Sequence, residues 1–201
     1  RPDLAVGFHE PRDLARERVA AVEALLPHVA DPDERSALLL EQLFDELIDL
    51  QDAKAAAITA EQMVEATGDA AWTKEVAAIL WASVGSMAFA SRWAESLHET
   101  LRSSGVEGGP WASLAARWAW AAGDEARARE IAVAAHRIEP ADRYLTALLM
   151  RLASAGREGA LLLETAERAA DADPDGGVRW LVLAAAWLRT LGALDLARRA
   201  L

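Results

Sequence analysis

The chain has 201 residues, and 32 acidic side chains against 21 lysines and arginines give it a net charge of −11 at pH 7. Such an acidic surface repels phosphate backbones, so direct nucleic-acid binding by this segment is not expected. The absence of cysteine excludes disulfides, thiolate metal sites and a cysteine nucleophile. Hydrophobic residues make up 53% of the chain, and many of them are alanine, the best helix former, so an all-α fold is predicted.

No apolar run reaches the roughly 18–20 residues that a membrane-spanning helix needs. The longest such run, 178–188, contains Arg179 and is followed by Arg189. The chain also begins without the charged and apolar segments of a secretory signal. We therefore expect a cytoplasmic protein with no membrane insertion.

Residues 1–31 are predicted to form an extended lead-in and a capping helix that begins at Pro11. Residues 32–201 then read as about five helical hairpins, the last of which is truncated or packs on something else. Residues 103–109, rich in serine and glycine, are interpreted as a long loop between repeats rather than a domain boundary. The predicted helix pairs are 32–50 with 53–66, 70–84 with 87–102, 111–122 with 124–138, 142–155 with 158–170, and 178–191 with 193–201.

The two helices of each pair are separated by a short break, and the breaks recur at a nearly constant interval. They begin at residues 51, 85, 123, 156 and 192, so subtraction gives spacings of 34, 38, 33 and 36. Five residues after the break comes Ala56, Ala90, Ala128 or Ala197, whereas the fourth hairpin has Leu161 there. A fixed period of this length is the signature of a repeat architecture.

The clearest copy of the repeat is the stretch 118–140. Gly123 suits the left-handed residue after a helix, Ala128 and Ala135 lie seven residues apart, and Pro140 stops the second helix. This pattern resembles the tetratricopeptide repeat family. The resemblance implies a right-handed α-solenoid of helix–turn–helix repeats, in which the first helices line a concave groove that holds a protein or peptide partner.

Groove positions counted back from each break run from acidic near the N-terminus to basic near the C-terminus. Such a gradient could orient an extended partner. Most of the eight tryptophans are expected to pack in the core, but two of them, Trp72 and Trp120, face the predicted groove and are candidate anchors. The candidate partner-binding residues are Trp72, Glu75, Arg117, Trp120, Arg143, Met150, Arg179 and Arg189.

Catalysis has no visible support in the sequence. The four histidines are far apart, and phosphate-binding, dinucleotide-binding and serine-nucleophile motifs are absent. We therefore predict no enzyme activity, no cofactor and no metal site. The branch of the family that grips C-terminal carboxylates uses Lys and Asn in its groove, and this chain contains no Asn.

Two other functions stay open at the level of sequence. Alanine-rich, degenerate repeats also resemble the ligand-sensing or regulatory halves of large bacterial transcription regulators. The last helices keep an apolar side, so the chain could instead form a homo-oligomer through its C-terminal helices.

Overall fold

The computed structural model describes residues 11–68, 70–106, 108, 110–173 and 176–201, so the predicted lead-in at 1–10 lies outside the described residues. Within the described part of the chain every regular element is a helix, which confirms the all-α class. The elements are α1 (Pro11–Leu25), η1 (Leu26–His28), α2 (Pro32–Phe44), η2 (Asp45–Asp49), α3 (Ala53–Ala66), α4 (Ala71–Ser83), α5 (Met87–Ser103), α6 (Trp111–Ala121), α7 (Glu125–Ile138), α8 (Arg143–Ala155), α9 (Gly159–Ala172), α10 (Val178–Thr190) and α11 (Leu194–Arg199).

The chain divides into two compact units, 1–104 and 105–201. The division falls in the segment 103–109, which the sequence analysis treats as an inter-repeat loop. This segment therefore contains the boundary between the two compact units.

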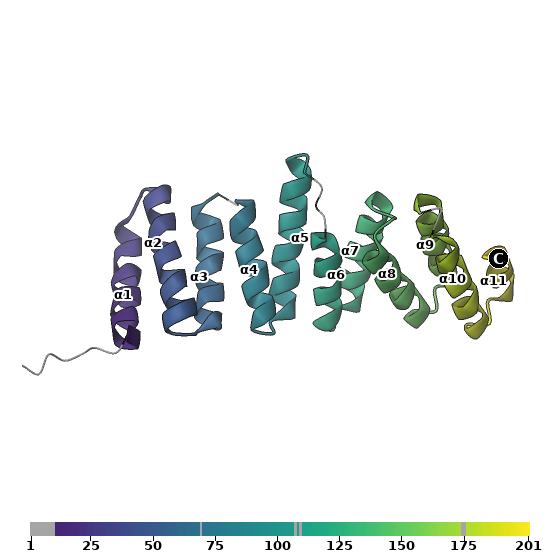
Figure 1. The fold of residues 1–201 in the computed structure, drawn as a ribbon, viewed down its shortest axis with the longest axis horizontal. Helices are drawn as coiled ribbons and strands as arrows, with labels where there is room; N and C mark the ends of the chain where they lie inside the picture. Colours follow the sequence, from purple (N-terminus) through teal and green to yellow (C-terminus); the bar gives the residue numbers. More distant parts are fainter. Residues whose placement is uncertain (1–10, 69, 107, 109, 174–175) are drawn as a thin grey trace, which may run out of the picture. The chain divides into compact units, whose positions relative to one another are not determined.

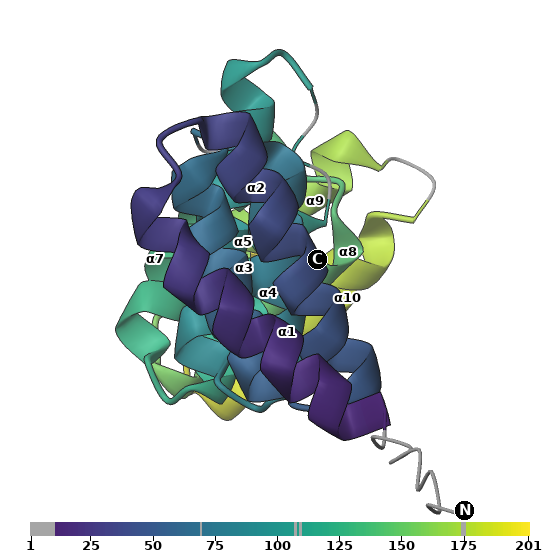
Figure 2. The same cartoon turned by 90° about the vertical axis from the view of Figure 1, so that its left-hand side faces the viewer.

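In unit 1, α1 to α5 lie side by side in chain order, and each helix packs on the next (Figure 1). Figure 2 looks onto α1, which lies in front of α2. Only Ala15 and Val22 of α1 are buried, so this helix covers α2 with a narrow apolar stripe and presents a polar surface to solvent. Pro27 lies in the short 3₁₀ turn that ends this helical segment, and Asp31 then caps α2 by accepting a hydrogen bond from the Asp33 backbone.

In unit 2, α6 to α11 also pack consecutively, and the first helices of neighbouring hairpins contact each other as well, α6 with α8 and α8 with α10 (Figure 1). Alanines at Ala128, Ala166 and Ala184 are fully buried, so helices approach closely there. Asp124 and Asp142 cap α7 and α8 by accepting backbone hydrogen bonds at the helix starts. The hairpins of this unit are therefore fixed by small core residues and by capping carboxylates.

A residue with positive φ lies in each of the five breaks between paired helices. Three are glycines, and the other two are Gln51 and Arg157, both at φ 56°. The left-handed residue of the fourth break is thus Arg157 and not Gly156, so this break lies one residue later than predicted. Counted from Arg157, the fifth residue is Leu162, which is buried like its four counterparts, whereas Leu161 is only partly buried. The five positions are Gln51, Gly85, Gly123, Arg157 and Gly192, which subtraction places 34, 38, 34 and 35 residues apart.

Arg157→Gly is expected to raise the free energy of unfolding by about 0.5–1 kcal/mol, because glycine removes the strain of a side chain at positive φ but adds freedom to the unfolded chain. Urea denaturation measures the change. Arg157→Ala keeps a Cβ at the same backbone conformation, so it should leave stability nearly unchanged. Equal changes in the free energy of unfolding for the two substitutions would contradict this prediction, because they would mean that loss of the Arg157 side chain, and not relief of backbone strain, causes the effect.

Candidate functional site

The three first helices of unit 2 have an unusual charge pattern. In a chain with a large acidic surplus, α6, α8 and α10 contain five arginines and no Asp, Glu or Lys. The second helices α7, α9 and α11 all carry acidic residues. We call the exposed set on the first helices the arginine surface; its members are Arg117, Arg143, Arg151, Arg179 and Arg189.

One contact across α6 and α8 holds part of the arginine surface in place. The Arg151 guanidinium carbon lies 4.9 Å from the centroid of the Trp120 ring, a cation–π distance. Trp120 is therefore partly covered by the protein's own arginine. Arg151 was not among the residues predicted from sequence, although the absence of acids along its helix was visible there.

At the other end of α8, two arginines share one carboxylate. The Asp173 carboxylate lies 3.8 Å from the Arg143 guanidinium and 3.6 Å from that of Arg179, and it also accepts a hydrogen bond from the Gly176 backbone. These ion-pair distances are long and both arginines are about half exposed or more. Among the described residues, the ion pairs of Arg143 and Arg179 share this one carboxylate, which leaves positive charge available to a ligand.

The structure places the predicted residues in two groups. Arg117, Arg143, Arg179 and Arg189 are exposed in unit 2, and Trp120 is partly buried there; Trp72 and Glu75 are exposed on α4 of unit 1.

The groove position predicted for Met150 is wrong. Met150 is fully buried in the core cluster that α8, α9 and α10 form in unit 2, so its side chain is not available to a partner. Because the apolar face of α8 is wide, it includes Met150, and the neighbouring Arg151 is the residue exposed to solvent.

Unit 1 has first helices of a different chemistry. Phe44 and Ile48, spaced four residues apart on α2 and η2, are 51% and 62% exposed, and Trp72 and Ile79 are exposed on α4. Acidic Glu41 and Glu75 lie among them in the sequence and are also exposed. The first helices of unit 1 are therefore apolar and acidic, where those of unit 2 are basic. Phe44 was not predicted from the sequence, because a phenylalanine in a leucine-rich helix looks like a core residue.

The end of α2 winds into a π-helical segment, Asp45–Asp49, and such segments often occur at functional sites. The buried Glu46 carboxylate accepts hydrogen bonds from Gln42 Nε2 at 2.8 Å and from Thr59 Oγ1 at 2.7 Å. Burial raises the pKa of Glu46, and the hydrogen bonds from Gln42 and Thr59 oppose this effect. On the outer side, Arg18 of α1 pairs with Asp45 and Asp49.

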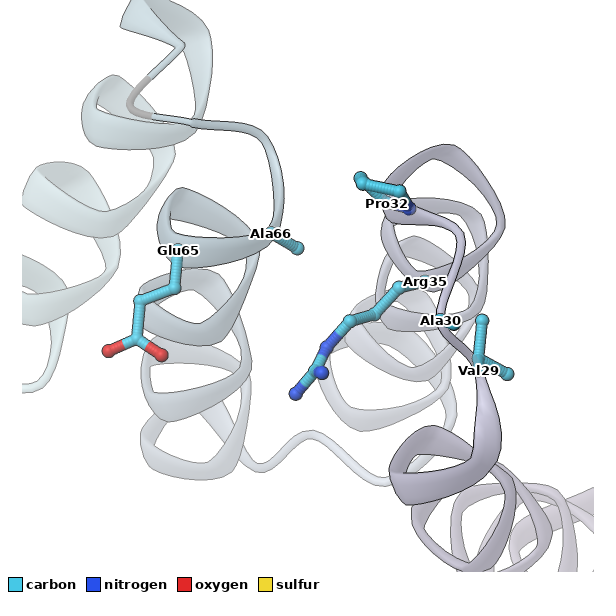
Figure 3. A pocket seen from close by; sticks show the side chains of 6 residues that line it. All are labelled: Val29, Ala30, Pro32, Arg35, Glu65 and Ala66. Atoms are coloured by element: carbon cyan, nitrogen blue, oxygen red, sulfur yellow. The ribbon is translucent and has the colours of Figure 1, made fainter.

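Two hollows in unit 1 were considered as ligand sites. An open one of about 470 Å³ lies between α1 and α2, with Phe44 and Leu25 on its apolar walls. A second, of about 280 Å³, lies between the start of α2 and the end of α3, where Arg35 reaches from α2 toward α3 and Glu65 lies on α3 (Figure 3). The residues that line these two hollows include no serine, threonine, cysteine, histidine or lysine.

The buried histidine His136 contacts the hydroxyl group of Thr146 in the interior of unit 2. Its Nε2 lies 3.2 Å from Thr146 Oγ1, which in turn donates to the Asp142 backbone carbonyl, and burial lowers the pKa of His136. A search of the described residues finds no grouping of three or more His, Cys, Asp or Glu side chains that could hold a metal ion. Nor does that part of the chain include a helix whose length and apolar character would let it cross a membrane.

No protein-family model matches the chain, and no curated protein matches it.

Proposed function

We propose that this protein is a non-catalytic, tetratricopeptide-like binding module that holds a protein or peptide partner on the arginine surface of unit 2. The observation that supports the proposal best is the arginine surface itself, five exposed cations on three packed first helices without an acidic residue. An exposed surface of one charge, inside a chain of opposite net charge, favours a complementary partner.

The partner proposed is an acidic, extended peptide segment. Guanidinium groups recognise carboxylates with paired hydrogen bonds. The Asp173 carboxylate lies near Arg143 and Arg179 only at ion-pair distances of 3.8 and 3.6 Å, so both guanidinium groups can still bind the carboxylate of a ligand. A nucleic acid would meet the same arginines, but its dense charge is repelled more strongly by a protein of net charge −11. A short acidic peptide carries less charge and suits this surface better.

The test is a titration of the protein with a labelled peptide of alternating Glu and Ala, beside a control peptide with Gln in place of Glu. We expect only the acidic peptide to bind, with an affinity that falls as salt rises. Replacing Arg143 and Arg179 together by Ala should weaken binding about tenfold, since two exposed guanidinium contacts contribute on the order of 1–2 kcal/mol.

The matched control is Arg137→Ala, which removes the same charge from an exposed position on α7, outside the arginine surface. An equal loss per charge in this variant would show that net charge alone drives binding and would contradict the proposal. Tighter binding of a single-stranded oligonucleotide than of the acidic peptide would replace the proposed partner by a nucleic acid.

Self-assembly through the C-terminal helices is a second candidate function. The observation that favours it is the set of exposed aliphatic side chains on α10 and α11, where Val178, Val182 and Leu194 are each more than half exposed. Sedimentation analysis at increasing protein concentration tests it. A mass that stays at one chain throughout would rule this candidate out, and it would leave the arginine surface unaffected.

A further inference from the structure

A cluster of aromatic side chains surrounds a carboxylate in unit 1. Glu61 lies on α3, Trp81 on α4, and Phe89, Arg92 and Trp93 on α5. These helices pack consecutively, so three elements contribute to one site. We call this set the Glu61 cluster.

The carboxylate of the Glu61 cluster is held by ring donors. Glu61 Oε1 accepts hydrogen bonds from the indole Nε1 of Trp81 at 3.0 Å and from that of Trp93 at 2.6 Å. It also accepts one from the Arg92 guanidinium at 3.0 Å. Indole N–H groups have fixed directions, so the two tryptophans hold the carboxylate in place whether or not Arg92 is present.

The rings of the cluster form a surface on which a cation lies. Trp81 and Phe89 stack with centroids 4.8 Å apart, and the Arg92 guanidinium carbon is 5.1 Å from the Phe89 centroid and 5.1 Å from the Trp93 ring. Aromatic faces attract cations, and a carboxylate beside them adds a charged acceptor. Ring faces and a fixed carboxylate together make a receptor for an organic cation.

Arg92 is a loosely held occupant of this receptor. Its side chain is 60% exposed, whereas the Glu61 side chain is 25% exposed and Trp81 only 6%. Exposed ion pairs contribute little to stability because solvent screens them and the side chain loses freedom. Arg92 can therefore leave without disturbing the tryptophans and the carboxylate below it.

We propose that the Glu61 cluster is a guanidinium-binding site, which Arg92 fills in the free protein and which the guanidinium of a ligand takes by displacing Arg92. A flat guanidinium can lie on the rings and donate to Glu61 at the same time. An ammonium group is compact and strongly hydrated, so it matches the site less well. The group can come from a free guanidino compound or from an arginine of a partner protein.

This site is independent of the proposed function, because it lies in the other unit and selects a ligand of opposite charge. The indole N–H signals of Trp81 and Trp93 in a two-dimensional NMR spectrum report on it directly, and Trp81→Phe and Trp93→Phe assign them. The full 201-residue chain is titrated with N-acetylargininamide, with N-acetyllysinamide and with a short peptide that contains one arginine.

We expect N-acetylargininamide to shift both indole signals and N-acetyllysinamide to shift them much less. Arg92→Ala should tighten binding roughly tenfold, because the internal competitor is lost. Glu61→Gln keeps an acceptor for the indoles but removes the charge, so it should abolish binding. Arg102→Ala, which removes an exposed arginine from the last turn of α5, is the control and should bind like the natural chain.

The same titration distinguishes the two possible sources of the guanidinium group. Equal affinity for N-acetylargininamide and for the peptide indicates a free guanidino compound, and tighter binding of the peptide indicates an arginine of a partner; either result supports the site. The proposal is overturned if neither the natural chain nor Arg92→Ala shifts the two indole signals with N-acetylargininamide. It is also overturned if Glu61→Gln binds as well as the natural chain does.

Discussion

Replacing Met150 by Ala is expected to lower the free energy of unfolding by about 2–4 kcal/mol, whereas replacing its neighbour Arg151 should lower it by less than about 1 kcal/mol. Met150 is fully buried between α8, α9 and α10, so its truncation leaves a cavity. Arg151 is exposed, and its contact with the Trp120 ring is the interaction lost. Urea denaturation of the two variants measures both changes.

For binding of the acidic peptide, the order of the two variants should be reversed: Arg151→Ala should lose more affinity than Met150→Ala. Arg151→Ala removes a cation from the arginine surface and should weaken the acidic peptide severalfold, since one guanidinium contact at an exposed site contributes up to about 1 kcal/mol. Met150→Ala, measured below its unfolding transition, should bind within about twofold of the natural chain. Weaker peptide binding by Met150→Ala, under conditions in which the variant is fully folded, would contradict this prediction. It would mean that the packing of Met150 in the core affects the arginine surface.

Helix boundaries were predictable because the chain marks them chemically. The predicted second helix of the first hairpin, 53–66, agrees at both ends with α3, where Asp52 caps the start. Pro11 and Pro32 likewise begin α1 and α2. These signals are local, and a local signal can be recognised without knowledge of the packing.

The shifted fourth break shows where local chemistry misleads. Gly156 is the residue that glycine preference selects, yet its φ is −76° and the left-handed conformation falls on Arg157. The buried position of Leu162 requires the later turn, because the inward face of α9 begins one residue further on. Packing of α9 thus overrides the preference of the turn residue.

The site was less predictable than the fold, because exposure depends on how wide each buried face is. The helical spacing along α8 predicted that Met150 faces the groove. Six other residues of this helix are buried together with Met150, and the neighbouring Arg151 is the residue that is exposed. Interactions between distant residues were also beyond the sequence. The hydrogen bonds of Trp81 and Trp93 to Glu61 join residues 20 and 32 positions apart, and no spacing rule connects them.

Glu46→Gln is expected to raise the free energy of unfolding at neutral pH, which is an unusual result for a buried polar residue. The Glu46 side chain belongs to the π-helical segment and is buried, and its hydrogen-bond partners Gln42 and Thr59 are neutral. A buried carboxylate without a cation destabilises the fold when it is ionised. Glutamine has the same shape and carries no charge.

The hydrogen bonds around Glu46 can survive the substitution. The new amide oxygen can accept from Gln42 Nε2, and the new amide nitrogen can donate to Thr59 Oγ1. The Thr59 hydroxyl can then donate to a backbone carbonyl one turn earlier, as threonine commonly does in helices. Gln42 and Thr59 thus each keep a hydrogen bond to residue 46, so the removed charge decides the sign of the effect.

The pH dependence gives the sharper measurement. The pKa of Glu46 is raised in the folded state, so folding binds the proton more tightly, and the resulting stability is present at low pH and lost as pH rises through the folded pKa. The advantage of Glu46→Gln should therefore be small near pH 4 and grow toward neutral pH. Urea denaturation of the natural chain and of Glu46→Gln at pH 4 and at pH 7 measures this difference.

Two comparisons isolate the role of burial. Glu41→Gln removes the same charge from an exposed position on α2 and should change stability by less than about 0.5 kcal/mol at any pH. Glu46→Ala removes the carboxylate to which Gln42 and Thr59 both donate, so it should be less stable than Glu46→Gln at every pH. A loss of stability in Glu46→Gln that does not vary with pH would contradict this prediction, because it would mean that the folded pKa of Glu46 equals its ordinary value.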